Sequence, residues 1–479
     1  MTSILSSKSL STSKTMRACA VHLRWNLGGV GSMMNRTANG VSNAAGVSSA
    51  SPTTKMYSTL PMIPSPLLSP PSPVKVPSQS TSQIIVSPTN RKYHNSTMTQ
   101  QSQQEEEMKD EYGEMTADGE TYVEKDFILE DSVVLPEAEL RYQTYGELNE
   151  AKDNVIVVCH ALTGNASLHS WWGDLLGDDK AFDTSKYLIV CCNILGSCYG
   201  STNPQSINPK TNSPYGKDFP DVSVKDTVKL QLNLIKHGLG ASSIKCVIGG
   251  SFGGMQTMEF AVQGGISGGE FVSKDGSPFV RSVIPIACGA SHTAWQIAIS
   301  EVQRQAIYAD PAWKSEPFQA TKGLEVARQM GMISYRTAHG YSTKFGRELR
   351  ESDENKSSRY GSNASWQVKS YLEYQGVKFI DRFDPVTYVK MTEQMDSHDI
   401  SRNRGSSVEE VLQSVEIPAC VLGIDSDVLY PLSEQKEIVE NMPNSELQII
   451  HSDDGHDGFL LEQDQVNRCI VDFLSKQSS

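Results

Sequence analysis

The feature that most constrains this chain is the stretch 246–256, which reads Cys-Val-Ile-Gly-Gly-Ser-Phe-Gly-Gly-Met-Gln. A short apolar run, typical of a buried strand, is followed by a glycine-rich turn and then by apolar residues at helical spacing. This order, with its G-x-S-x-G pattern, is typical of a nucleophile elbow. Such a turn lifts the hydroxyl of Ser251 above a sheet, and the small residues Gly249, Gly253 and Gly254 leave room for it. The alternative is a glycine-rich turn that only connects a strand to a helix.

Charge and cysteine content exclude several classes of protein. The formal net charge of the 479 residues is −14, which argues against nucleic acid and anionic membranes as partners. No apolar run is long enough to predict a transmembrane helix. The nine cysteines are scattered without a C-x-x-C pair, so we expect reduced, mostly buried thiols in a reducing compartment. The residues predict no metal site.

The first part of the chain, residues 1–110, differs from everything after it. It is rich in Ser, Thr, Pro and Asn, and nine Lys and Arg precede Glu105, the first acidic residue. A basic, hydroxyl-rich leader without acids is typical of an organellar transit peptide, for a mitochondrion or a plastid. The alternative is a disordered tail of a cytoplasmic protein. An acidic linker extends to about residue 121.

Short apolar runs alternate with helical patterns from residue 122 onward. Residues 127–145 alternate in hydrophobicity and predict an antiparallel pair of edge strands. The runs expected to form buried strands are Val155–Cys159, Tyr187–Asn193, Lys245–Gly249, Val283–Ala287, Ala419–Ile424 and Leu447–His451. Such runs, separated by helices, predict an α/β fold with a mostly parallel sheet flanked by helices. Ligands of these sheets bind at the carboxyl ends of the strands.

The pattern changes between residues 291 and 414, where helical stretches dominate. The stretches expected to be helical are His292–Tyr308, Ala320–Tyr335, Gln367–Phe379, Pro385–Met395 and Val408–Val415, with a polar excursion at 352–365. We interpret 291–414 as an inserted helical lid. The α/β core then comprises 122–290 and 415–476. A lid of this kind excludes water from a reaction intermediate.

Two loops after predicted strands suggest an oxyanion hole and a site wall. The loop that follows Cys159 offers the backbone N–H of Leu162 as a donor, and the residue after the nucleophile, Phe252, offers another. His160 lies in the same loop but precedes the nucleophile, so we interpret it as structural. The glycine-rich loop 194–204 lacks the ending of a phosphate loop and is expected to line the site.

The acid and the base follow the last two predicted strands. Asp425 and Asp427 come directly after Ala419–Ile424, and His456 lies in a glycine-flanked loop after the final strand. The order of Ser251, an aspartate and then a histidine is the order that a strand-borne nucleophile requires on this fold. The residues alone leave open which aspartate orients His456.

The chain resembles the homoserine O-acetyltransferases of the α/β-hydrolase superfamily. The segments that carry the resemblance are 160–164, 193–202, 249–256, 301–307, 323–328, 371–376, 426–431 and 455–458. The resemblance implies Ser251 as nucleophile, Asp427 as orienting acid and His456 as base, with Arg328 and Asp457 holding the amino-acid substrate. One fixed cation and one fixed anion suit an α-amino acid, because it carries one carboxylate and one ammonium.

The resemblance also implies the reaction and the partners. Acetyl-CoA would acylate Ser251 as a co-substrate, L-homoserine would accept the acetyl group, and no bound cofactor or metal is expected. A homodimer through the lid helices is implied. The alternatives are a serine O-acyltransferase or a homoserine O-succinyltransferase of the same family, or an esterase or thioesterase that uses water. A binding protein without activity is disfavoured, because competent residues occupy all three catalytic positions.

Overall fold

The computed structural model describes residues 115, 118–349 and 366–477, all within one compact unit. The leader at 1–110, most of the acidic linker and the polar excursion at 352–365 lie outside the described residues. Within those residues, no helix is long and apolar enough to cross a membrane.

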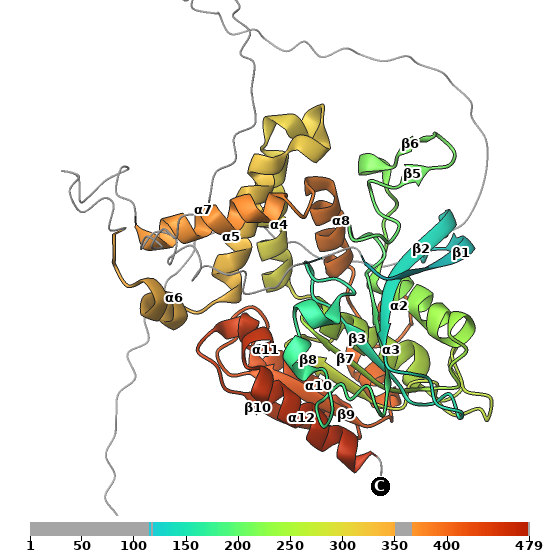
Figure 1. Ribbon diagram of the computed structural model, residues 1–479. Coiled ribbons are helices and arrows are strands. Elements are labelled where there is room, and N and C mark those ends of the chain that lie inside the picture. The colour runs from blue at the N-terminus through green and yellow to red at the C-terminus, as the bar shows by residue number, and fades with distance from the viewer. Residues whose placement is uncertain (1–114, 116–117, 350–365, 478–479) are drawn as a thin grey trace, which may run out of the picture. The chain divides into compact units, whose positions relative to one another are not determined.

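The described residues form an eight-stranded sheet in the order β1-β2-β4-β3-β7-β8-β9-β10 (Figure 1). The strands are β1 (Glu120–Ile128), β2 (Val134–Tyr145), β3 (Val155–Cys159), β4 (Leu188–Cys192), β7 (Ile244–Gly250), β8 (Val283–Ile286), β9 (Ala419–Ile424) and β10 (Ser445–Ile450). Strands β3, β4 and β7–β10 are parallel. The predicted α/β fold with a mostly parallel sheet is therefore confirmed.

The N-terminal hairpin differs in detail from the prediction. Strands β1 and β2 are antiparallel, as expected, but β1 begins at Glu120, and of these two strands β1 alone lies at an edge of the sheet. Strand β2 also pairs with β4, with Tyr142 opposite Cys192. Its outward positions carry polar residues while its inward positions are buried, and this alternation looks the same in an edge strand and in the next strand inward. A separate two-stranded ribbon joins β5 (Ile207–Asn208) and β6 (Ser213–Pro214).

Side chains that alternate along the central strands fill two cores, one on each face of the sheet. Val155 and Val157 of β3 belong to one core and Ile156 and Val158 to the other. The first core is covered by α2 (Val224–Asn233), α3 (Phe252–Gly265), α9 (Val408–Ser414) and α10 (Leu432–Asn441). The second is covered by α12 (Gln463–Lys476) and by the segment around Trp172, with the short α11 (Gly458–Leu461) nearby.

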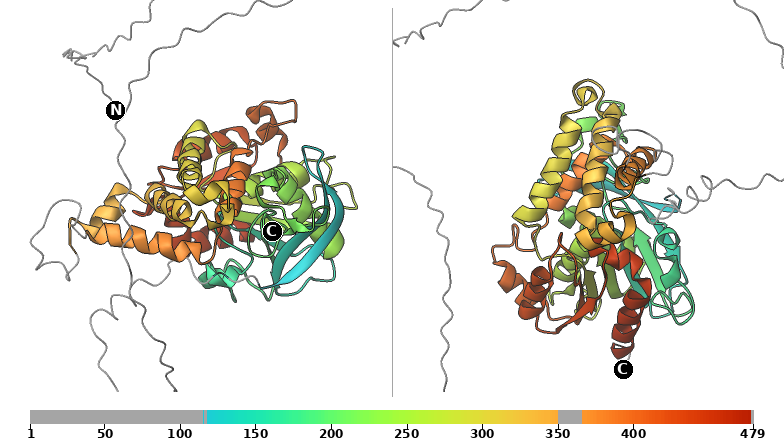
Figure 2. Two further views of the ribbon diagram at one scale, coloured as in Figure 1. Left: turned by 90° about the horizontal axis from the view of Figure 1, so that it is seen from above. Right: turned by 90° about the vertical axis from the view of Figure 1, so that its left-hand side faces the viewer.

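The insertion between β8 and β9 forms a layer of helices at one end of the sheet (Figures 1 and 2). It contains α4 (Ala294–Tyr308), α5 (Thr321–Tyr335), α6 (Ala338–Phe345), α7 (Gln367–Ile380) and α8 (Pro385–Asp396). Its apolar side chains form a third cluster with core residues, in which Phe379 and Tyr388 of the lid join Phe252 and Leu162. Helix α6 was not predicted, because its sequence Ala-His-Gly-Tyr-Ser-Thr-Lys-Phe is mostly polar and buries none of its residues.

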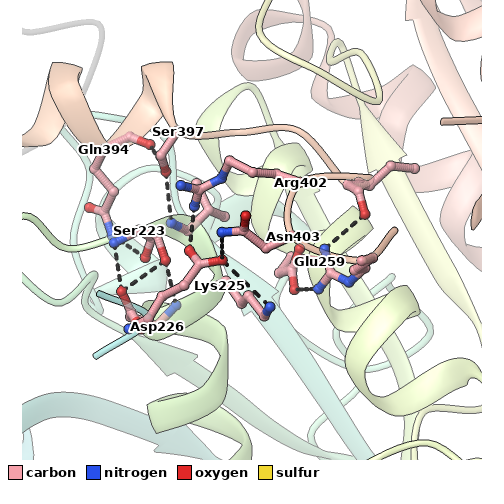
Figure 3. A network of polar contacts seen from close by, with 12 residues as sticks. Ser223, Lys225, Asp226, Glu259, Gln394, Ser397, Arg402 and Asn403 are labelled. Atoms are coloured by element: carbon pink, nitrogen blue, oxygen red, sulfur yellow. Dashed lines mark hydrogen bonds and ion pairs between the residues drawn. The ribbon is translucent and has the colours of Figure 1, made fainter. Parts of the chain in front are cut away.

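A polar network fastens the chain where it leaves the lid and returns to the core (Figure 3). The carboxylate of Glu130, after β1, accepts hydrogen bonds from Arg402 at 2.5 Å and Asn403 at 3.1 Å. Arg404 forms an ion pair with Glu259 of α3, which is almost fully buried. These contacts join the segment 402–404, which leads from the lid back to the core, to the β1–β2 hairpin and to α3, and so hold it in place.

Candidate active site

Ser251 lies in the sharp turn between β7 and α3. Its φ of 59° and ψ of −122° place it in a region that residues with a Cβ rarely adopt. Its N–H donates to the carbonyl of Ile286 at 2.9 Å, and its carbonyl accepts from Met255 at 3.1 Å, so the turn is held from both sides. A Cβ at Gly253 would overlap the carbonyl oxygen of Cys159. The glycine at that position is therefore a steric requirement of the elbow.

Two backbone N–H groups were predicted to form an oxyanion hole. Phe252 is the first residue of α3, where a backbone N–H has no acceptor within its own helix and lies at the positive end of the helix dipole. Leu162 lies in the loop after β3, which Gln256 of α3 ties to the elbow by donating to the carbonyls of His160 and Phe252, each at 3.3 Å. This tie brings the two predicted donor segments together, and their role stays a prediction.

His160 has a structural place, in agreement with its interpretation from sequence. Its Nε2 accepts from the N–H of Ile194 at 3.2 Å, so its Nδ1 carries the proton and donates to Ala161 O at 2.8 Å. Complete burial lowers the pKa of His160 to about 4. A neutral ring with both nitrogens engaged is not positioned to act as a base.

The structure distinguishes the two aspartates that the sequence left open. Oδ2 of Asp427 lies 2.7 Å from Nδ1 of His456, and both side chains are buried. Asp425 instead contacts His451 at 2.7 Å, and this pair is exposed. The other oxygen of Asp427, Oδ1, accepts from the N–H groups of Leu429 and Tyr430. Asp427 is therefore the carboxylate that orients His456.

His456 is buried among aromatic rings. The ring centroids of Tyr430 and Phe459 lie 5.1 and 5.5 Å from that of His456. Its Nε2 has no hydrogen-bond partner among the described residues, and the contact of Nδ1 with a carboxylate places the proton on Nδ1. Burial alone would lower the pKa of His456, but the charge of Asp427 and the hydrogen bond to it, with a smaller contribution from Asp457, raise it. The ring thus presents an available basic nitrogen.

Ser251 and His456, the predicted nucleophile and base, both lie at the carboxyl ends of parallel strands. Ser251 follows β7, and His456 lies in the turn after β10. Gly250, which precedes Ser251, packs closely on the ring of Phe459, because a Cβ there would lie 2.5 Å from that ring. Phe459 in turn contacts His456 edge-on. The structure therefore brings all three predicted catalytic residues to one edge of the sheet.

The two predicted substrate-binding residues also lie here. Arg328, on α5, is buried with its guanidinium 5.0 Å from the ring centroid of Phe379. Asp457 is buried next to His456 and accepts from Nε of Arg336 at 2.7 Å. Burial raises the pKa of Tyr335, the charge of Arg328 lowers it and that of Asp457 raises it, so this phenol lies within reach of both charges.

Sequence reasoning missed Tyr335 and Arg336. Tyr335 is seven residues after Arg328, a spacing that places both on one face of α5, and this was an available signal. Arg336 joins Asp457 to Asp454, with Nη1 donating to the latter at 2.6 Å. No pattern in the sequence pairs a residue at the end of α5 with a loop more than a hundred positions later.

Comparison with known proteins gives consistent results. A family described as the alpha/beta hydrolase fold matches residues 154–463. The chain is 43% identical to a homoserine O-acetyltransferase of Chlorobium chlorochromatii, over 73% of this chain and 93% of that protein. It is 42% identical to one of Salinibacter ruber, over 71% of this chain and 92% of the relative. The crystal structure of a homoserine O-acetyltransferase from Bacillus anthracis superposes with a TM-score of 0.65 and 25% identity, covering 74% and 96% of the two chains.

Proposed function

The chain belongs to the homoserine O-acetyltransferase family of the α/β-hydrolase fold, and from this premise we propose how its site works. The enzyme transfers an acetyl group to the hydroxyl of L-homoserine, a step of methionine biosynthesis. We propose acetyl-CoA as the acyl donor, with no resident cofactor. The observation that carries the mechanism is the buried hydrogen bond between His456 and Asp427, at the same sheet edge as the strained Ser251.

In the first half-reaction, Nε2 of His456 takes the proton of the Ser251 hydroxyl. The serine oxygen forms a bond to the acetyl carbon, and the N–H groups of Phe252 and Leu162 stabilise the negative charge on the carbonyl oxygen. The bond from carbon to sulfur then breaks, and His456 returns the proton to the departing thiolate. The products are free CoA and an acetyl-serine enzyme.

In the second half-reaction, L-homoserine replaces CoA. His456 takes the proton of the homoserine hydroxyl, whose oxygen attacks the acetyl carbon. The bond to Ser251 breaks, and His456 gives the proton back to the serine oxygen. The buried aromatic rings around His456 favour this acceptor over water, since they limit solvent at the basic nitrogen.

The charged residues beside the base suit an α-amino acid. Arg328 would hold the carboxylate, and Asp457 would hold the ammonium while remaining paired with Arg336. Tyr335, whose phenol senses the charges of Arg328 and Asp457, would contact the α-amino and α-carboxyl end of the substrate. An esterase for neutral substrates has no need of a buried cation and a buried anion at this place.

A thiol-release assay that crosses acetyl-CoA and succinyl-CoA with L-homoserine and L-serine tests the proposal. We expect rapid release only with acetyl-CoA and L-homoserine together. Preference for L-serine would instead identify a serine O-acyltransferase, and preference for succinyl-CoA would identify a homoserine O-succinyltransferase. Equal release without any amino acid would identify a thioesterase.

We also propose that the enzyme is a homodimer through the lid. Trp295 and Val302 lie seven residues apart on α4, and Val326 and Ile333 have the same spacing on α5, so each pair lies on one helix face. All four side chains are exposed in the single chain. Analytical ultracentrifugation of the wild-type protein and of Val302→Lys tests this, with a dimer expected for the first and a monomer for the second.

For the leader, we propose that residues 1–110 direct the chain to an organelle, on the basis of their acid-free basic composition. A fusion of residues 1–121 to a fluorescent protein should accumulate in mitochondria or plastids. Diffuse fluorescence throughout the cytoplasm would contradict the proposal.

A further inference from the structure

The loop that carries Asp427 is held from the lid. On α4, the side chain of Gln296 is buried, and its Nε2 donates to the carbonyl of Leu429 at 2.8 Å. The N–H of that same Leu429 donates to Oδ1 of Asp427 at 2.8 Å. A single residue, Leu429, therefore lies between the lid amide and the carboxylate that orients His456, and the N–H of the next residue, Tyr430, also donates to that carboxylate at 2.9 Å.

The orientation of the Gln296 amide follows from its other contacts. Its oxygen accepts from the backbone N–H of Thr293 at 2.8 Å, so the oxygen points to the start of α4 and the nitrogen points to the loop. The nitrogen also donates to Oε1 of Glu434 at 2.8 Å. A second link from the same helix runs from the indole N–H of Trp295 to the carbonyl of Val428 at 2.9 Å.

Glu434 restricts where the Gln296 amide can move. Its carboxylate packs against the backbone of Gly289, because a Cβ there would lie 2.7 Å from Oε2. The pKa of Glu434 is raised to about 7, because burial and the nearby charge of Asp427 outweigh the hydrogen bond from Gln296, which lowers it. The amide is thus enclosed by α4 on one side and by α10 on the other.

We propose that Gln296 is a positioning residue for the catalytic acid, which fixes Asp427 through Leu429 and so couples the first lid helix to the base. The inference rests on the proposed function, because it assigns Asp427 and His456 their roles. Gln296 need not touch substrate. Its effect passes to His456 through the loop, so a displaced loop lengthens the contact between Asp427 and His456.

Two substitutions separate the donor role from packing. Gln296→Glu has nearly the same shape and still accepts from Thr293, but it offers Leu429 and Glu434 no N–H. Gln296→Ala removes the amide entirely. Since a displacement of about 1 Å in a catalytic group can cost about 100-fold in rate, we expect kcat to fall at least about tenfold in both, with KM little changed. The matched control is Gln305→Ala on the same helix, whose exposed side-chain amide donates to Glu301, and it should retain wild-type kcat.

A double substitution tests which contact matters. In Gln296→Glu with Glu434→Gln, the new amide at 434 donates to the new carboxylate at 296, so the contact between the two side chains is restored and two buried carboxylates no longer face each other. The carbonyl of Leu429 still lacks its donor. We therefore expect thermal stability to recover and kcat to remain low. Full recovery of kcat would overturn the proposal.

A second readout is independent of the natural substrates. The rate at which a fluorophosphonate labels Ser251 should follow the titration of His456, which faces Asp427 and Asp457 and is surrounded by Tyr335, Tyr430 and Phe459. Weakening the contact with Asp427 lowers the pKa of His456, so the acid limb of the labelling profile should move to lower pH in Gln296→Ala, which adds no charge near the pair. An unmoved limb, or a kcat within about twofold of wild type, would refute the proposal. If the wild-type enzyme is labelled but transfers no acetyl group to L-homoserine, the proposed function fails while this test remains valid.

Discussion

Replacing Asp427 by Asn should change the proton position on His456 while keeping the shape of the site. Oδ1 of Asp427 accepts from the N–H groups of Leu429 and Tyr430, at 2.8 and 2.9 Å. An Asn must therefore place its oxygen there, because its NH₂ cannot accept, and its NH₂ then faces Nδ1 of His456. His456 must lose the Nδ1 proton and carry it on Nε2 instead.

The tautomer forced by this change cannot take a proton from Ser251. The equivalent substitution in chymotrypsin-type triads lowers kcat by about 10⁴-fold, which corresponds to about 5.5 kcal/mol in the barrier. We expect a loss of that order here. The side chains of His456 and Asp427 are only 3% and 0% exposed, so solvent cannot replace the lost contact, and this burial supports a loss as large as that one.

The assay is release of CoA from acetyl-CoA in the presence of L-homoserine, measured at saturating substrate. Asp425→Asn is the matched control, since Asp425 follows the same strand but pairs with the exposed His451. The control should keep a kcat within about twofold of wild type, as exposed pairs contribute little. A kcat for Asp427→Asn within tenfold of wild type would refute the assigned role of the acid.

Three further predictions follow from other contacts. Gly253→Ala should destabilise the fold by about 3 kcal/mol in urea unfolding, because its Cβ would overlap Cys159 O; unchanged stability would contradict the described elbow. Arg328→Lys should raise KM for L-homoserine about 10- to 100-fold with a smaller change in KM for acetyl-CoA, because Lys cannot bind a carboxylate bidentately; equal changes in both would count against the assignment. Glu130→Gln should lower the melting temperature at neutral pH through its contact with Arg402. The pKa of Glu130 is lowered from its ordinary 4.5, because its hydrogen bonds and nearby cations outweigh the effect of burial, so its contribution is present above pH 4.5 and is lost as the pH falls through the lowered pKa. Melting curves at neutral and strongly acidic pH check this, and a difference that persists in acid would contradict it.

The sheet was predictable because its central strands are buried on both faces. Such strands read as continuous apolar runs, and β3 and β9 have the predicted bounds, Val155–Cys159 and Ala419–Ile424. The helix α6 was missed because its sequence is mostly polar and none of its residues is buried, so no apolar face marks it as a helix. The start of β1 was missed for a similar reason, since its outer residues are polar.

The positions of the catalytic side chains were predictable only as far as strand order determines them. Strand ends place Ser251, an aspartate and His456 at one edge, but Asp425 and Asp427 follow the same strand two residues apart. Only the path of the loop decides which carboxylate turns inward, and that path depends on hydrogen bonds from Gln296 to residues more than a hundred positions away. The pair between Arg336 and Asp457 was hidden for the same reason.

The central claim is that Ser251 carries the acetyl group between the two substrates. Rapid quenching of the enzyme with acetyl-CoA and no amino acid, followed by peptide mass spectrometry, tests it most directly. We predict one acetyl group on the peptide that contains Ser251, which disappears when L-homoserine is added before the quench. An enzyme that turns over at its full rate with no acetylated Ser251, or with the acetyl group on another residue, would contradict the claim.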